Sequence, residues 1–363
     1  MGKRVFNFGA GPCALPLSVL EEAQAEFTNY KNSGMSVIEL SHRGKEYEGS
    51  HDEAMQLAKE VYGTPTDFEV LFIQGGATLQ FAMIPMNLLK KGGKKGAYVC
   101  CGEWAGKAFK EGAIYGDVYA AWDGKSEKYI RMPKNDEIKL QPDTAYLHIT
   151  TNETIGGIRT IEWPDVNVPL IADMSSDFMT RPIPWEKFDI VYGGVQKNLG
   201  PSGMAVVFVR KSALAAMNKN IGTYFRYDVH CDNKSLYNTP PVFSIYIMGK
   251  VLKWMKSLGG LSGIQKIAEN KASVVYNAID GSSGYYNCPV VKEYRSIMNI
   301  VFRLSNPTLE EKFLSEAKKA DLIGLKGHRS VGGCRASCYN AVPMEAVVAL
   351  KNFMEKFHKE NPV

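Results

Sequence analysis

Lys197 is the residue of this chain whose surroundings most favour chemistry. Residues 190–209 are apolar, neutral polar or glycine, and Lys197 is the only charged residue among them. Most lysines are solvated surface charges, but an ammonium group on a glycine-containing loop between two apolar segments is partly removed from water. Desolvation disfavours the charged form and lowers the pKa of an amine, which makes it a nucleophile that can form a Schiff base. We therefore expect Lys197 to be a reactive amine.

Asp173 is the second candidate, because of its position relative to Lys197. It follows the apolar segment 168–172, so we expect it at the carboxyl end of a strand, where open α/β sheets bind their ligands. An aspartate at such a place can also cap a helix or a turn. Pyridoxal phosphate needs both a lysine for a Schiff base and a carboxylate that keeps its pyridine nitrogen protonated. Because Lys197 and Asp173 follow neighbouring strand candidates, they predict a pyridoxal phosphate site.

Three further segments have residues that suit anions. Gly75 and Gly76 lie between a strand candidate and a helix candidate, where backbone amides can approach a phosphate. Such a pair is more often a simple turn, and it lacks the spacing of a dinucleotide site or a P-loop. The other two segments carry imidazole and guanidinium groups, at His42 and Arg43 and at His328, Arg329 and Arg335. Either segment alone is explained by charged side chains that are solvated at the surface. Together the two segments favour a substrate with more than one anionic group.

The composition argues against several classes of protein. The 363 residues include 43 Lys and Arg against 38 Asp and Glu, spread along the chain, so nucleic acid is not an expected partner. Apolar segments such as 204–209 are far shorter than the roughly 20 residues that span a bilayer. Gly9, Gly11 and Pro12 interrupt the apolar core that a signal peptide needs. The seven cysteines form no Cys-x-x-Cys pair, which favours reduced thiols, a cytoplasmic location and no metal site.

The apolar pattern predicts the elements that position these groups. Helices are expected at residues 16–32, 45–62, 78–89, 261–280 and from 343 onward. Short strands are expected at 70–73, 97–101, 117–122, 145–149, 168–172, 189–192 and 204–209. These strands are continuously apolar rather than alternating, which is typical of strands that helices cover on both faces. The chain is therefore expected to have an α/β fold with a mostly parallel sheet.

This pattern predicts that the chain has three parts. Residues 1–15 are rich in glycine and proline and predict an extended arm. Residues 16–260 predict a large domain that contains the sheet. Gly259 and Gly260 then interrupt the chain, and residues 261–363, with a further strand within 296–304, predict a smaller C-terminal α+β domain.

Motifs from residue 7 to about residue 345 together resemble the phosphoserine aminotransferase family. They lie at residues 7–12, 41–45, 152–154, 172–176, 196–201, 238–241 and 327–337. The His-Arg-Ser-Val-Gly-Gly stretch at 328–333 separates this family from its class V relatives. The resemblance implies the aspartate-aminotransferase-like fold, called fold type I, with a large pyridoxal phosphate domain and a smaller C-terminal domain.

The resemblance also implies roles for individual residues. Lys197 forms the Schiff base, Asp173 pairs with the pyridine nitrogen, and Trp104, which core packing alone would otherwise explain, stacks on the ring. Thr154 lies near the phenolic oxygen of the cofactor, and Ala77, Thr78 and Gln196 surround its phosphate. Many family members have Arg or Ser where Thr78 stands. Arg335 holds the substrate α-carboxylate, and the second anionic group of the substrate is bound by His42, Arg43, His328 and Arg329.

The implied activity is transfer of an amino group from L-glutamate to 3-phosphohydroxypyruvate. In bacteria the family also transaminates a phosphorylated hydroxythreonine precursor of pyridoxine, and no residue reports on that second substrate. In the family, the residues that match Asn238 and Thr239 reach the phosphate of the other subunit, which implies a homodimer with shared sites. Some of the substrate-binding cations are also expected to cross that interface.

Three alternatives are kept. A cysteine desulfurase would need a mobile catalytic cysteine, and Cys334 and Cys338 flank Arg335. An alanine–glyoxylate type aminotransferase would have no use for several cations beyond the α-carboxylate anchor. A protein of another class would bind anions with the same sheet and catalyse nothing.

Overall fold

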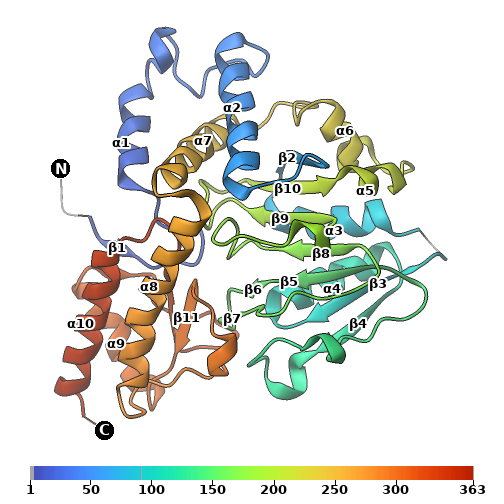
Figure 1. Ribbon diagram of the computed structural model, residues 1–363. Helices are drawn as coiled ribbons and strands as arrows, with labels where there is room; N and C mark the ends of the chain where they lie inside the picture. The colour runs from blue at the N-terminus through green and yellow to red at the C-terminus, as the bar shows by residue number, and fades with distance from the viewer. Residues whose placement is uncertain (1–3, 91, 363) are drawn as a thin grey trace.

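A computed structural model of the chain describes residues 4–90 and 92–362 (Figure 1). Its largest feature is a seven-stranded sheet with the order β2-β10-β9-β8-β5-β3-β4. β10 is antiparallel to both of its neighbours, and the remaining pairs are parallel, which confirms the predicted mostly parallel sheet. The strands are β2 (Phe68–Gln74), β3 (Lys95–Cys100), β4 (Val118–Asp123), β5 (Thr144–Thr150), β8 (Leu170–Asp173), β9 (Ile190–Gly194) and β10 (Met204–Arg210).

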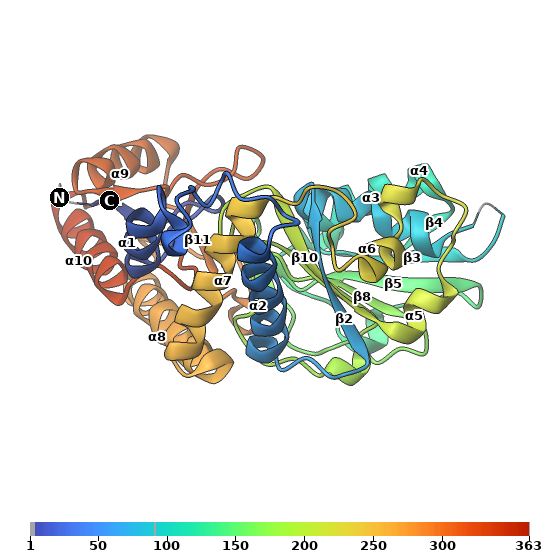
Figure 2. The ribbon, with the colours of Figure 1, turned by 90° about the horizontal axis from the view of Figure 1, so that it is seen from above.

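Helices cover both faces of this sheet, as the continuously apolar strands predicted. Along β10, Val206 and Phe208 belong to one core and Val207 and Val209 to the other, since successive side chains of a strand point to opposite faces. Figure 2 shows the two groups of helices on either side of the strands. The helices are α2 (Lys45–Tyr62), α3 (Gly76–Leu88), α4 (Glu103–Tyr115), α5 (Lys211–Ala216), α6 (Tyr227–Asp232) and α7 (Val242–Ser257). No helix within the described ranges is both long and apolar enough to cross a membrane.

The residues after α7 form a second group of elements beside the sheet. Strands β11 and β13 pair antiparallel, and α8 packs against α10. The elements are α8 (Gly260–Asp280), β11 (Asn299–Phe302), α9 (Pro307–Lys319), β12 (Leu322–Ile323), β13 (Cys334–Ser337) and α10 (Met344–Glu360). The predicted division of the chain at residue 260 stays a prediction, and residues 1–3 and 363 of its two outer parts lie outside the described residues.

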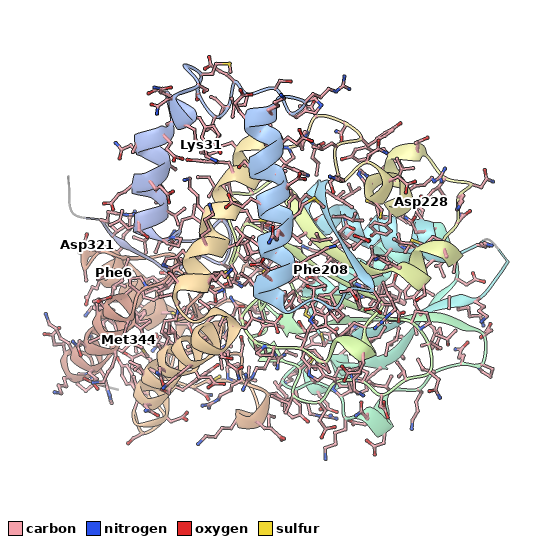
Figure 3. All side chains as sticks on the ribbon, turned by 45° about the horizontal axis from the view of Figure 1, so that its top comes forward. Phe6, Lys31, Phe208, Asp228, Asp321 and Met344 are labelled. Carbon is pink, nitrogen blue, oxygen red and sulfur yellow. The ribbon has the colours of Figure 1, made fainter. Side chains whose placement is uncertain are left out.

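The N-terminal arm is extended and joins the C-terminal elements. Strand β1 (Phe6–Asn7) pairs parallel with β12. The Phe6 amide donates a hydrogen bond of 2.8 Å to the Asp321 carbonyl, and Figure 3 shows these two residues side by side. The N-terminal arm is therefore held by the C-terminal elements.

The helix predicted at residues 16–32 is wrong in its second half. Helix α1 (Leu17–Glu26) ends early, and the chain then turns. The Asn29 side chain accepts a hydrogen bond of 2.8 Å from the Gly34 amide, and Lys31 has a positive φ of 48°. Because asparagine side chains bond to nearby backbone groups, they compete with helix formation at such places.

Candidate active site

Lys197 lies in the turn between β9 and β10 and is 8% exposed. Its Nζ donates a hydrogen bond of 2.7 Å to Oγ1 of Thr154. Burial lowers the pKa of Lys197, while the negative charges of Asp173 and Glu153 oppose that shift. This is the desolvated environment that the sequence predicted, and it favours the free amine that nucleophilic chemistry requires.

Asp173 is the last residue of β8 and is 4% exposed. Its Oδ1 accepts hydrogen bonds from the Ser175 amide at 2.9 Å and from the Ser175 hydroxyl at 2.6 Å. Burial raises the pKa of Asp173, and the charge of Lys197 and the bonds from Ser175 oppose that change. The carboxylate is therefore held at the carboxyl edge of the sheet, as predicted from the end of the apolar segment.

A cavity of about 430 Å³ joins Lys197 to the first turn of α3. Gly75 and Gly76 have φ values of 89° and 62°, a left-handed turn that glycine adopts without a steric penalty. The first turn of α3 contains no acidic residue, and the free amides of a helix N-terminus favour an anion. Six of the predicted cofactor residues line the cavity, namely Ala77, Thr78, Trp104, Asp173, Gln196 and Lys197.

The groups around this cavity fit pyridoxal phosphate. Trp104 Nε1 and Gln196 Oε1 are buried and have no hydrogen-bond partner among the described residues, whereas buried polar atoms in proteins usually have one. The Trp104 ring centroid lies 5.6 Å from Lys197 Nζ. An amine, a carboxylate, an indole ring and a helix N-terminus match the aldehyde, the ring nitrogen, the flat ring and the phosphate of this cofactor.

Arg335 lies next to this cavity and is connected to it through Thr154. It is on β13, is 9% exposed, and its Nη1 donates a hydrogen bond of 3.4 Å to the Thr154 carbonyl. Its Nε is buried without a partner among the described residues. Burial lowers the pKa of Arg335, and the charges of Tyr339 and Glu153 oppose that shift. A buried guanidinium with free donors suits a carboxylate ligand.

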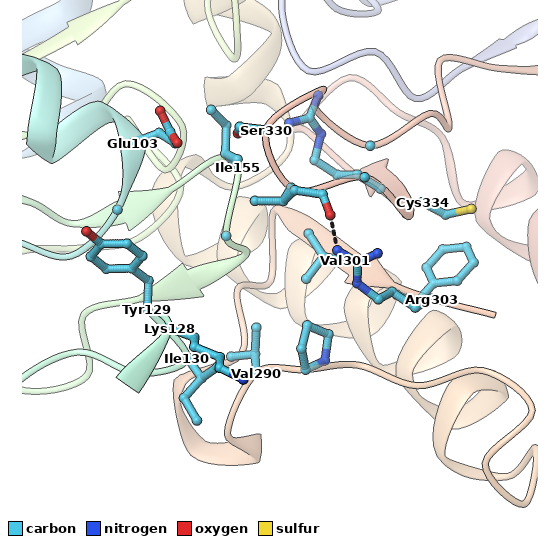
Figure 4. Close-up of a pocket in the computed structure, with 18 residues that line it drawn as sticks. Glu103, Lys128, Tyr129, Ile130, Ile155, Val290, Val301, Arg303, Ser330 and Cys334 are labelled. Carbon is cyan, nitrogen blue, oxygen red and sulfur yellow. Dashed lines mark hydrogen bonds between the residues drawn. The ribbon is translucent and has the colours of Figure 1, made fainter. Parts of the chain in front are cut away.

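A second cavity, of about 450 Å³, opens on Arg335 (Figure 4). Val301 and Arg303 line it from the C-terminal elements, and in Figure 4 Tyr129 lies on the opposite wall. Ile155, which follows Thr154 in the chain, also lines it. Arg335 therefore faces a cavity between the strand-side residues Tyr129 and Ile155 and the C-terminal elements, separate from the cavity at Lys197.

Seven predicted residues line neither cavity within the described part of the chain: Thr154, which contacts Lys197 and Arg335, and six others. Asn238 Nδ2 donates a hydrogen bond of 3.0 Å to Gln74 Oε1, and Gln74 Nε2 donates one of 2.9 Å to the Thr239 carbonyl. The other four lie on the loops before α2 and before β13: His42, Arg43, His328 and Arg329. The prediction for Asn238 and Thr239 concerns the site of another subunit, so it stays a prediction.

Glu153 is a candidate that the sequence reasoning missed. It lies on the two-residue strand β6 (Asn152–Glu153), is 0% exposed, and its charge acts on Lys197. Its motif at residues 152–154 carries the family resemblance, but the resemblance implies no role for Glu153. Because glutamate is rarely fully buried, the residue type alone does not indicate a site residue. Only its position between Asn152 and Thr154 in the motif indicates one.

A mostly parallel sheet covered on both faces, with a buried lysine and aspartate at one edge, is the arrangement expected of the class of fold type I pyridoxal phosphate enzymes. Residues 5–350 match the aminotransferase class-V family. The chain is 52% identical over 360 residues to the phosphoserine aminotransferase of Niallia circulans, with 99% of each chain covered. The solved structure of phosphoserine aminotransferase from Bacillus circulans subsp. alkalophilus is 51% identical, with a TM-score of 0.97 and 99% of each chain covered. The chain belongs to the phosphoserine aminotransferase family.

The cofactor follows from the same comparisons. A phosphoserine aminotransferase from Trichomonas vaginalis, solved with pyridoxal phosphate bound, is 40% identical, with a TM-score of 0.91 over 97% of this chain and 100% of that one. The chain is a pyridoxal phosphate-dependent transaminase. The predicted fold type and cofactor are confirmed.

Proposed function

We propose that this enzyme transfers an amino group from L-glutamate to 3-phosphohydroxypyruvate, giving O-phospho-L-serine and 2-oxoglutarate for L-serine synthesis. The observation that carries the proposal is the chain of contacts from Lys197 through Thr154 to Arg335. These contacts place the desolvated amine of Lys197 on one side of Thr154 and the guanidinium of Arg335, which suits a carboxylate, on the other. The names of the relatives support this substrate class. Because it has the same α-carboxylate and phosphate, 4-phosphohydroxythreonine of pyridoxine synthesis is a second proposed substrate.

We assign a described residue to each part of the cofactor. Lys197 would hold its carbonyl carbon, Asp173 its ring nitrogen and Trp104 the face of its ring. Thr154 would contact its phenolic oxygen, and the phosphate would be bound by Ala77, Thr78 and Gln196 with the amides of α3. When bound, pyridoxal phosphate supplies an electron sink that stabilises negative charge at the substrate α-carbon.

Lys197 is the proposed acid and base. Once the substrate amine has displaced it from the cofactor, its Nζ, desolvated and held by Thr154 Oγ1, would move the proton between the substrate α-carbon and the cofactor. Asp173, fixed by Ser175, would keep a negative charge at the far side of the cavity. Arg335 would bind the substrate α-carboxylate and so hold the α-carbon near the amine.

The second anionic group of each substrate needs further cations. We assign that role to His42, Arg43, His328 and Arg329, some of them acting across the interface of a homodimer. Asn238 and Thr239 would reach the phosphate site of the other subunit. The seven cysteines are all free, which supports the cytoplasm as the location of the enzyme.

The cysteine desulfurase alternative loses support from the burial of its candidate thiols. Cys334 is 1% exposed and Cys338 is 0% exposed. Burial raises the pKa of the Cys338 thiol to about 11 and raises that of Cys334 as well. A catalytic cysteine needs an accessible thiolate, so neither residue suits that reaction.

An absorbance titration of the purified holoenzyme tests the proposal. O-phospho-L-serine and L-glutamate should each remove the near-visible band of the bound cofactor, and 3-phosphohydroxypyruvate should restore it. L-alanine and L-cysteine serve as competing amino donors. A band that responds to either of these two but not to O-phospho-L-serine would replace the proposed function with one of the alternatives.

A further inference from the structure

Glu153 is a buried carboxylate whose hydrogen-bond partners are backbone amides. Its Oε2 accepts hydrogen bonds from the Trp104 amide at 3.0 Å and from the Ala105 amide at 3.5 Å, and its Oε1 accepts one from the Ile155 amide at 3.4 Å. Glu153 is fully buried. A carboxylate is costly to bury unless its oxygens are hydrogen-bonded, so these contacts are what keep it inside.

The carboxylate completes the N-terminus of α4. The first amides of a helix have no partner within the helix, and Gly102, which precedes α4, has no side chain to cap them. Glu153 supplies the acceptor from a distant part of the chain, and its negative charge is favourable at a helix N-terminus. A Cβ at position 102 would lie 2.5 Å from Cγ of Glu153. Glycine at this position therefore permits the close approach.

The same contacts connect Glu153 to both sides of the cofactor cavity. Trp104, whose amide it holds, lines the cavity and has its ring centroid 5.6 Å from Lys197 Nζ. Thr154, the next residue in the chain, accepts the hydrogen bond from Lys197. A shift of the Glu153 carboxylate would thus move the indole ring and the hydroxyl that flank the lysine.

The charge of Glu153 also acts on Lys197. The other charged or titratable groups that act on this lysine are Asp173 at the end of β8, Asp177 just after it, Arg335 on β13, and Cys13 on the N-terminal arm. Burial raises the pKa of Glu153 to about 7, against the effect of its amide bonds and of Lys197. Above that pH its negative charge favours the protonated form of a nitrogen at the Lys197 position.

We propose that Glu153 is a positioning residue of the transaminase site, which holds Trp104 in place and sets a negative charge beside Lys197. This inference rests on the cofactor site proposed above. Glu153 does not touch substrate or cofactor in this account. It acts through the α4 N-terminus and through its charge.

Two substitutions separate the two effects. Glu153→Gln removes the charge; its one side-chain oxygen can still accept from the Trp104 and Ala105 amides, while its NH2 group gives up the longer bond from the Ile155 amide. The pH midpoint at which the cofactor absorbance changes should therefore fall by about one unit. Glu153→Asp keeps the charge on a shorter side chain that cannot reach the Trp104 amide as closely. It should leave the midpoint near that of the unchanged enzyme but release pyridoxal phosphate about tenfold faster during dialysis. Glu111→Gln, elsewhere on α4, is the control and should change neither quantity.

Failure of the positioning role gives a different result from failure of the proposed function. If Lys197 does not bind the cofactor, the unchanged enzyme has no pH-dependent band at all. If the band is present, but both Glu153 variants keep the midpoint and release rate of the unchanged enzyme, the positioning role is wrong. Circular dichroism establishes that each variant folds. If Glu153→Gln does not fold, the release rate of Glu153→Asp decides: faster release supports the role, and an unchanged rate overturns it.

Discussion

At the scale of single residues, Arg335 is the group whose removal should affect both substrates equally. Each substrate carries an α-carboxylate, and a guanidinium can give it two charged hydrogen bonds. Arg335→Gln should therefore lower kcat/KM about a hundredfold for L-glutamate and for O-phospho-L-serine alike, which corresponds to about 3 kcal/mol. Steady-state kinetics with each amino donor measure this. A loss confined to O-phospho-L-serine would assign Arg335 to the phosphate instead.

His148 should make stability depend on pH. It is 1% exposed on β5, its Nε2 lies 2.8 Å from the Tyr192 hydroxyl, and burial lowers its pKa to about 3. Between pH 3 and about 6.5 the unfolded chain binds a proton at this residue that the folded chain does not, so stability falls as the pH falls. From pH 7 to pH 5 this residue should remove about 2 kcal/mol.

Urea unfolding at the two pH values, for the unchanged protein and for His148→Gln, isolates this contribution. His51 and His230 also have pKa values lowered by burial. The free energy of unfolding of the unchanged protein should therefore fall by more than His148 alone accounts for. From pH 7 to pH 5 the free energy of unfolding of His148→Gln should fall by about 2 kcal/mol less than that of the unchanged protein. Equal losses in the two proteins would mean that His148 is not buried in its neutral form.

At the scale of elements, the turn into α3 should control cofactor binding. Gly75 has a φ of 89°, and a Cβ there would lie 2.8 Å from atoms of Leu79. Gly75→Ala should therefore lower the free energy of unfolding by about 2 kcal/mol and weaken pyridoxal phosphate binding. Gly63→Ala is the matched control, because Gly63 has a φ of 61° at the end of α2 and open space around its Cβ position. It should cost about 1 kcal/mol and leave cofactor binding unchanged.

Elements built from local patterns could be predicted, and those that depend on distant contacts could not. The strands were found because a strand covered on both faces is apolar along its length, and Lys197 stood out against that background. Helix α1 was drawn too long because the Asn29 turn competes with the helix. Arg335 was recognised by its motif, but its link to Thr154 depends on two segments far apart in the chain. The burial of Glu153 is likewise a tertiary property.

At the scale of the whole molecule, the proposed homodimer with shared sites predicts complementation between two inactive chains. One chain carries Lys197→Ala, and the other carries alanine at both Asn238 and Thr239. If these residues serve opposite subunits, a mixed dimer has one site with both defects and one intact site. Equal amounts of the two chains, refolded together, should recover about a quarter of the full activity. Activity no greater than the sum of the separate chains would mean that each subunit completes its own site.

The most direct test of the central claim is to reduce the holoenzyme with borohydride and locate the cofactor by peptide mass spectrometry. Lys271 is the internal comparison, since it is buried even more completely than Lys197, has its pKa lowered to about 8, and donates hydrogen bonds to the carbonyls of Tyr339, Asn340 and Val342. We expect the pyridoxyl adduct on Lys197 alone, and its loss together with transaminase activity in Lys197→Ala. An adduct on Lys271 or on any other lysine, or an active Lys197→Ala enzyme, would contradict the account.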